Sequence, residues 1–155
     1  MKPLTALALV VVCALALAAQ ASATIVIGRG IAGVDLRMSQ AAVRSKLGRP
    51  QKVGHGRNEF GRYAEFRYPG YVVDFQNNGT VTSVVTTLAR ERTPGGIGVG
   101  STWSQVRARV PHVRRDGTAT LGECHVGTLL PGRTVTDFFV AAGKVDRVVV
   151  GIVLD

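Results

Sequence analysis

The sequence predicts an α+β fold in which two tandem repeats, each a short helix followed by a three-strand meander, form one antiparallel sheet with the short helices packed on it. The first observation is a duplication, because segment 34–48 recurs sixty-three positions later as 97–111. The second observation is a shared turn signal, because a Pro-Gly pair follows each segment, at 69–70 and 131–132. A unit that recurs with the same turns is typical of a repeat fold.

Residues 1–23 are predicted to be a secretory signal peptide. Lys2 provides a positive start, stretch 4–19 is apolar, and Ala21-Ser22-Ala23 has the A-x-A form of a cleavage site. The apolar stretch is shorter than the ~20 residues of a membrane-spanning helix, and an uncleaved anchor is the alternative interpretation. We therefore expect a protein that is secreted or extracytoplasmic after cleavage near Ala23.

The first repeat is predicted to span 24–93, with a helix near its start. Ser39 is a favourable N-cap, and Val43 and Leu47 lie one turn apart on the same helix face. Gly48 then ends the helix. The helix is too short to persist alone, so it must pack on other elements.

Three strands are expected to follow in this repeat, over 61–68, 71–75 and 80–88, after a loop at 48–61. Residues of the first strand alternate between two faces. The apolar face carries Ala64, Phe66 and Tyr68, and the polar face carries Tyr63, Glu65 and Arg67. Pro69-Gly70 suits the centre of a type II turn, and Asn78-Gly79 is a strong hairpin signal.

The second repeat is predicted to span 94–155 and to pack with the first as one domain. Thr102 is its helix N-cap, and Gln105 completes a capping box. Strands are expected near 119–126, 134–140 and 144–154. The last strand is apolar on both faces from Val148 to Leu154, which indicates either a central, covered strand or an outer face that binds a partner.

The charge balance points to anionic partners as one possibility. Loss of Lys2 with residues 1–23 lowers the formal net charge from +9 to +8. Such an excess attracts polyanions, including anionic envelope polymers and lipids. Nucleic acid is not expected as a partner, because the basic residues come mostly singly and the chain is expected to be exported.

Two features of the chain resemble reactive sites without completing one. Segment 28–33 reads Gly-x-Gly-x-x-Gly, but no long helix or second parallel strand is expected after it, so no nucleotide or other cofactor is predicted. Once Cys13 is removed with residues 1–23, Cys124 has no partner for an internal disulfide. This leaves a buried, a reactive or an intermolecular thiol, and we expect a core residue.

No catalytic residue and no metal ligand is predicted from the remaining residues. The histidines lack metal-ligand spacing and the serines lack the Gly-x-Ser-x-Gly context. Asp74 and Asp137 fall on expected strands near the sheet ends and are not expected to form a carboxylate pair.

The first repeat resembles a known type of envelope protein. The matching pattern is Gly33-Val34-…-Met38-Ser39-Gln40-…-Val43-…-Leu47-Gly48-Arg49-Pro50, then Phe75-…-Asn78-Gly79-…-Val81. It looks like the envelope-assembly lipoproteins of the BamE (SmpA/OmlA) type, and the tandem units are similar to secreted β-lactamase inhibitor proteins. The resemblance implies a non-catalytic module that holds another protein. The chain lacks the lipid-acceptor cysteine of the former and the cysteine pairs of the latter, so it implies no specific target.

The sequence therefore predicts a secreted, non-catalytic binding module for protein–protein interaction in the cell envelope or outside the cell. The expected contact residues are Tyr63, Glu65 and Arg67, with Arg62 beside them, because Tyr and Arg often anchor interfaces. Packing of Tyr63 across strands is an equal alternative. A basic binder of anionic envelope polymers or lipids is the second hypothesis for the function, and an enzyme is the third.

Overall fold

The computed structural model describes residues 24–77, 79–117 and 121–155. The predicted signal peptide, 1–23, and Asn78 of the predicted hairpin lie outside these ranges. Among the described residues, no helix is long and apolar enough to cross a membrane.

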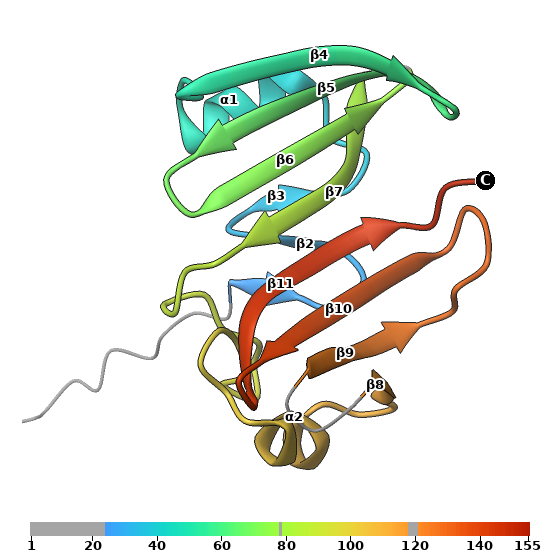
Figure 1. Ribbon diagram of the computed structural model, residues 1–155. Coiled ribbons are helices and arrows are strands. Elements are labelled where there is room, and N and C mark those ends of the chain that lie inside the picture. The colour runs from blue at the N-terminus through green and yellow to red at the C-terminus, as the bar shows by residue number, and fades with distance from the viewer. Residues whose placement is uncertain (1–23, 78, 118–120) are drawn as a thin grey trace, which may run out of the picture.

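An eight-stranded antiparallel sheet forms the main body of the protein (Figure 1). Its strands are β4 (Lys52–Asn58), β5 (Gly61–Tyr68), β6 (Tyr71–Gln76), β7 (Thr80–Thr86), β8 (Arg114–Gly117), β9 (Leu121–Gly127), β10 (Thr134–Ala141) and β11 (Lys144–Ile152). Their order is β4-β5-β6-β7-β11-β10-β9-β8. Each repeat thus contributes a meander of four strands, and the last strands of the two meanders pair at the middle of the sheet.

One face of this sheet carries the core. A small sheet made of β1 (Ile25–Val26), β2 (Gly30–Ile31) and β3 (Val34–Asp35) lies across its middle. Helices α1 (Gln40–Leu47) and α2 (Trp103–Arg109) lie toward its two ends (Figure 1). The fully buried side chains include Ile25, Ile31, Val34, Val43, Phe66, Phe75, Val106 and Phe138.

The prediction of an α+β fold with three strands per repeat is wrong. The chain is mostly β, with 49% strand and 12% helix. Residues 52–58, expected in a loop, form β4, an edge strand whose side chains are mostly exposed on both faces, so no apolar alternation marks it. Strands from 25–35, rather than the helices, cover the middle of the core face. Hydrogen bonds to distant residues hold this segment in place: the Thr24 amide donates to the Arg92 carbonyl, and the Gly28 amide donates to Thr136 Oγ1.

The helix ends are as the sequence predicts. Ser39 caps α1 by accepting a hydrogen bond from the Ala42 amide, and Thr102 and Gln105 form the predicted capping box of α2. Both cap residues also form an isolated bridge to the start of a strand, Ser39 to Thr80 and Thr102 to Lys144. The two repeats therefore share the attachment of helix to sheet as well as the sequence pattern.

The apolar last strand, β11, is central in the sheet, between β7 and β10. Val148 and Val150 point into the core and are fully buried, whereas Val149 points to the other face and is half-buried. Cys124 also points into the core, with an exposed fraction of 1%. Burial raises the pKa of its thiol, as expected for a structural cysteine.

Candidate functional site: the open face of the sheet

The face of the eight-stranded sheet turned away from β1–β3 and the helices has no described element over it (Figure 1). We call it the open face. Its side chains alternate along each strand with those of the core face. The open-face residues used below are Lys52, Gly54, Gly56, Tyr63, Glu65, Arg67, Val72, Asp74, Gln76, Ser83, Val85, Arg114, Glu123, His125, Val135, Asp137, Phe139, Arg147 and Val149.

Three of the four predicted contact residues share this face. Tyr63, Glu65 and Arg67 alternate along β5 with buried core residues, and Arg67 forms an ion pair with Glu65 at 2.5 Å. Arg62 points the other way, pairs in register with Arg57, and lines a hollow beside Gln40 of α1. The structure therefore separates Arg62 from the other three, because consecutive strand residues face opposite sides.

Tyr63 packs across strands and is also accessible. Its register partner is Gly56, and a Cβ at that glycine would lie 2.5 Å from the Tyr63 hydroxyl. The ring therefore covers the bare backbone of β4, an arrangement that compensates for a glycine in a strand. At 38% exposure the ring still offers contact area.

A single row of side chains crosses all eight strands in register. From β4 to β8 it runs Lys52, Arg67, Val72, Val85, Val149, Asp137, His125 and Arg114. Its middle, Val72, Val85 and Val149, is apolar and half-buried; we call these three residues the valine strip. The strip spans the junction of the two repeats, so both repeats contribute to it.

A carboxylate ends the valine strip on the side of the second repeat. Asp137 is partly buried, and its Oδ1 atom is buried without a hydrogen-bond partner among the described residues. The pKa of Asp137 is raised to about 6, chiefly by burial and also by nearby Glu123, while His125 opposes the shift. The protein thus keeps a costly charge on an otherwise uncovered surface at neutral pH.

A second carboxylate lies at the matching position of the first repeat. Asp74 precedes Asp137 by sixty-three residues, the offset of the duplication, and each is followed by a buried Phe. Burial is the main cause that raises the pKa of Asp74, and a hydrogen bond donated by Ser83 Oγ, at 2.6 Å, opposes it. The sequence signal for both sites is a repeated Val-x-Asp-Phe, which is visible only when the strands of the two repeats are aligned.

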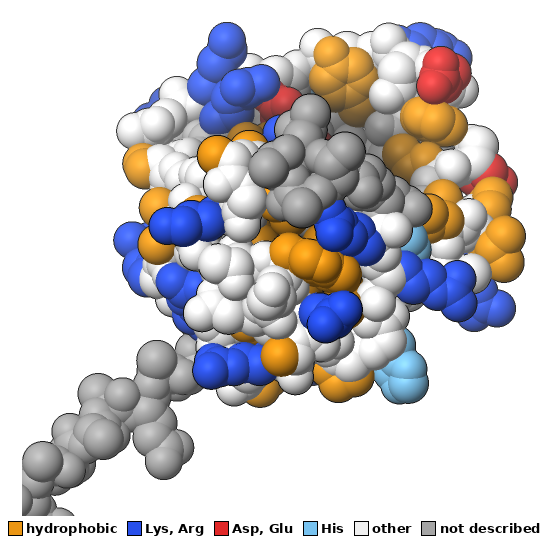
Figure 2. All heavy atoms as spheres, turned by 60° about the horizontal axis from the view of Figure 1, so that its bottom comes forward, with side chains coloured by type: hydrophobic (Ala, Val, Ile, Leu, Met, Phe, Trp, Pro, Cys, Tyr) orange, Lys and Arg blue, Asp and Glu red, His pale blue; other side chains and the backbone are white. Residues whose placement is uncertain are grey.

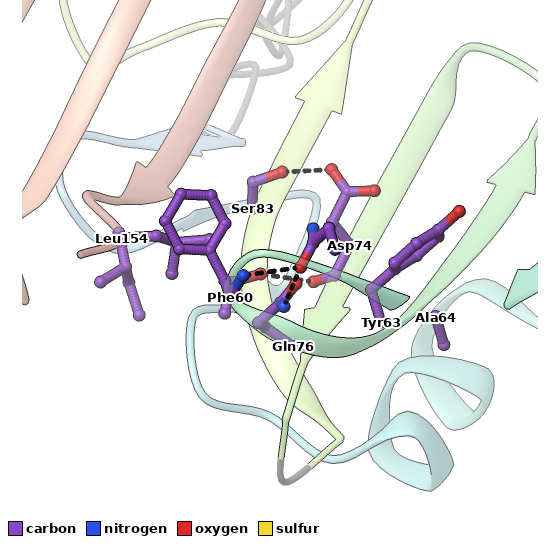
Figure 3. Close-up of a pocket in the computed structure, with 10 residues that line it drawn as sticks. Phe60, Tyr63, Ala64, Asp74, Gln76, Ser83 and Leu154 are labelled. Atoms are coloured by element: carbon purple, nitrogen blue, oxygen red, sulfur yellow. Dashed lines mark hydrogen bonds between the residues drawn. The ribbon is translucent and has the colours of Figure 1, made fainter. Parts of the chain in front are cut away.

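Asp74 borders a hollow of about 270 Å³ at one end of the open face (Figure 3). Its apolar walls are Phe60, Tyr63, Ile152 and Leu154. Asn58 Oδ1 accepts hydrogen bonds from the Phe60 amide at 3.0 Å and from Gln76 Nε2 at 2.8 Å. These two bonds fix the β4–β5 turn, and with it the Phe60 ring, beside the hollow.

The excess of positive charge lies away from the open face. The described strand side chains on this face are balanced, with acidic Glu65, Asp74, Glu123 and Asp137 against basic Lys52, Arg67, Arg114 and Arg147. The net charge of +8 therefore belongs to the rest of residues 24–155. Figure 2 shows the end of the molecule around α2, where many separate Lys and Arg side chains and few acidic ones are visible.

The two partly buried carboxylates of the open face lie far apart. Asp74 and Asp137 lie on β6 and β10, three strand spacings apart, which is roughly 14 Å. Carboxylates that act together on one bond lie within ~10 Å of each other. Among the described residues, no group of three His, Cys, Asp or Glu side chains could hold a metal ion.

The chain matches no protein-family model, and no curated protein is significantly similar to it. Among solved structures, it is similar to a DUF4309 family protein, YjgB, from Bacillus subtilis subsp. subtilis str. 168. That likeness has a TM-score of 0.50 at 17% identity and covers 85% of this chain and 89% of that one. The uncharacterized protein yfeY from Escherichia coli has a TM-score of 0.48 at 12% identity, over 83% of this chain and 97% of that one. At these identities the likeness to YjgB extends to the fold alone.

Proposed function

We propose that the protein is a secreted, non-catalytic binding module that holds another protein on the open face of its sheet. The observation that carries the proposal is the valine strip on a sheet face that no described element covers. In register it ends at Arg67 on one side and at Asp137 on the other, and Asp74 borders it along β6. An apolar centre with a polar surround is the layout of a protein interface. The resemblance to BamE-type and β-lactamase-inhibitor modules implies the same use of the sheet.

The arrangement of the strip supports a protein partner over a polyanion. Its three valines are half-buried and uncharged, and the acidic and basic strand side chains described on the open face balance, so this face has no excess of positive charge to attract a polyanion. A polyanion would instead favour the end of the molecule around α2, where positive charge predominates (Figure 2). Binding of anionic envelope polymers or lipids at that end is the second candidate function.

A capture experiment with two matched variants tests the proposal. The immobilised protein is incubated with envelope and culture-fluid fractions at low and high salt, beside Val149→Lys and Val26→Lys. Both variants add one positive charge, but Val149 lies in the strip, whereas Val26 lies in β1, off the open face, and is 43% exposed. We expect one protein retained at high salt by the unchanged protein and by Val26→Lys, and lost from Val149→Lys.

Two outcomes contradict the proposal. Equal capture by Val149→Lys and Val26→Lys would place the binding surface elsewhere. Retention of anionic material that disappears with added salt would assign the binding to the positive charge, because each neutralised anionic group releases counterions.

A further inference from the structure

The hollow beside Asp74 has the properties of a receptor for a cation. Asp74 Oδ2 accepts the hydrogen bond from Ser83, while Asp74 Oδ1 receives none from the described residues. Gln76 gives its amide nitrogen to Asn58, which leaves its carbonyl oxygen as an acceptor. Gln76 is also 7% exposed, so its orientation is fixed by its surroundings. A carboxylate and a side-chain amide therefore border one cavity.

The charged groups around Asp74 leave it without a cation. Arg67 lowers the pKa of Asp74 by less than burial raises it, and the Arg67 guanidinium forms its ion pair with Glu65. Arg37 lines a neighbouring hollow that shares Gln76 and Ile152 with this one, and no ion pair joins it to Asp74. Among the described residues Asp74 therefore forms no ion pair, and a cationic group from outside the chain can pair with it.

The shape and walls of the hollow select the kind of cation. Its volume of about 270 Å³ is many times the ~30 Å³ of one water molecule and lies below the ~300 Å³ at which small-molecule pockets begin. One long side chain fits this size. The rings of Phe60 and Tyr63 border the cavity (Figure 3), and aromatic rings attract cations.

Asp74 and Gln76 are alternate residues of β6, so their backbones lie roughly 7 Å apart along the strand. A planar guanidinium presents five donors in a rigid fork and can reach two separated acceptors, whereas an ammonium is a point charge. We propose that this hollow receives an arginine side chain of the partner protein. The inference rests on the proposed function and names the chemistry that the partner must present.

The test is an NMR titration of the purified ¹⁵N-labelled protein with N-acetyl-arginine amide. N-acetyl-citrulline amide, which has the same shape without the charge, and N-acetyl-lysine amide are the comparison probes. We expect saturable shifts of the Asp74 and Gln76 amide signals with the arginine probe. Binding of the citrulline and lysine probes should be about tenfold weaker or less, as expected when a hydrogen bond to a charged group is lost.

Three variants complete the design. Asp74→Asn and Phe60→Ala should each weaken arginine binding, by about tenfold for Asp74→Asn. Phe60 lies in a turn, so its replacement leaves the strands intact and guards against a folding defect in the other variant. Asp146→Asn is the charge-matched control, because Asp146 is exposed on β11 and lines none of the hollows described above. It should bind arginine as the unchanged protein does.

Equal binding of the arginine and citrulline probes, or of the arginine and lysine probes, would overturn the inference. So would unchanged arginine binding by Asp74→Asn, or shifts that map away from the hollow. If the capture experiment succeeds and arginine fails to bind, the open face is still supported as the binding surface, and the inference that the hollow receives an arginine is wrong. If arginine binds the hollow and no protein is captured through the strip, the proposed function falls instead.

Discussion

Replacing Asp137 by Asn should stabilise the protein at neutral pH. The carboxylate is partly buried beside Glu123, its Oδ1 atom lacks a hydrogen-bond partner among the described residues, and its pKa is raised to about 6. A raised pKa means that the folded state holds the proton more tightly than the unfolded state does. The ionised form is therefore the one that opposes folding.

The magnitude follows from the pKa. A rise from 3.8 to about 6 corresponds to ~3 kcal/mol of free energy of unfolding. The side chain remains in contact with solvent, and screening reduces the effect to ~1–2 kcal/mol. This cost is absent below pH 3.8, grows as the pH rises from about 4 to 6, and is complete above that range.

The assay is urea unfolding of the unchanged protein and of Asp137→Asn at several pH values between 4 and 8. We expect the variant to be more stable by ~1–2 kcal/mol at pH 7.5, with the difference shrinking toward zero near pH 4. Asp146→Asn, an exposed aspartate of the same hairpin, is the matched control and should show no such trend. A difference that is absent at pH 7.5, or that grows as the pH falls, would refute the reasoning.

Two further perturbations test parts of the fold that bear on the site. Gly56→Ala would place a Cβ 2.5 Å from the Tyr63 hydroxyl, so the ring must move and NOEs between residues 56 and 63 should change. Gly54→Ala is the control: its Cβ would make an ordinary 3.7 Å contact with Glu65 and should leave the Tyr63 ring in place. Cys124 is buried and its thiol pKa is raised, so a thiol reagent should react with it at least ~100-fold faster in denaturant than in buffer. Rapid reaction in buffer would contradict the packing.

The elements that the sequence predicted best are those set by local rules. The caps at Ser39 and Thr102 depend on residues three positions away, and the strand at 61–68 depends on alternation against one core face. Strand 52–58 could not be found in this way, because an edge strand with Gly54 and Gly56 has no apolar face and is defined by its pairing with β5.

The layer over the core face was missed for a related reason. Strands β1 to β3 have two residues each, too few to show a period, and their position depends on contacts with distant parts of the chain, such as that of Gly28 with Thr136. Of the predicted contact residues on β5, Tyr63, Glu65 and Arg67 share the open face, whereas Arg62 does not. From the sequence, the carboxylates Asp74 and Asp137 are expected near the sheet ends. The strand order cannot be derived from either repeat alone, because the two meanders join at β7 and β11.

The most direct test of the open face as the binding surface is site-specific photo-crosslinking. A photoreactive amino acid replaces Val85, in the middle of the valine strip, or Arg107, exposed on α2 at the end of the molecule where positive charge predominates. Both proteins are irradiated with the same envelope and culture-fluid fractions. We expect one crosslinked protein from position 85 and none from position 107. Crosslinks from position 107 alone would show that the partner binds away from the open face.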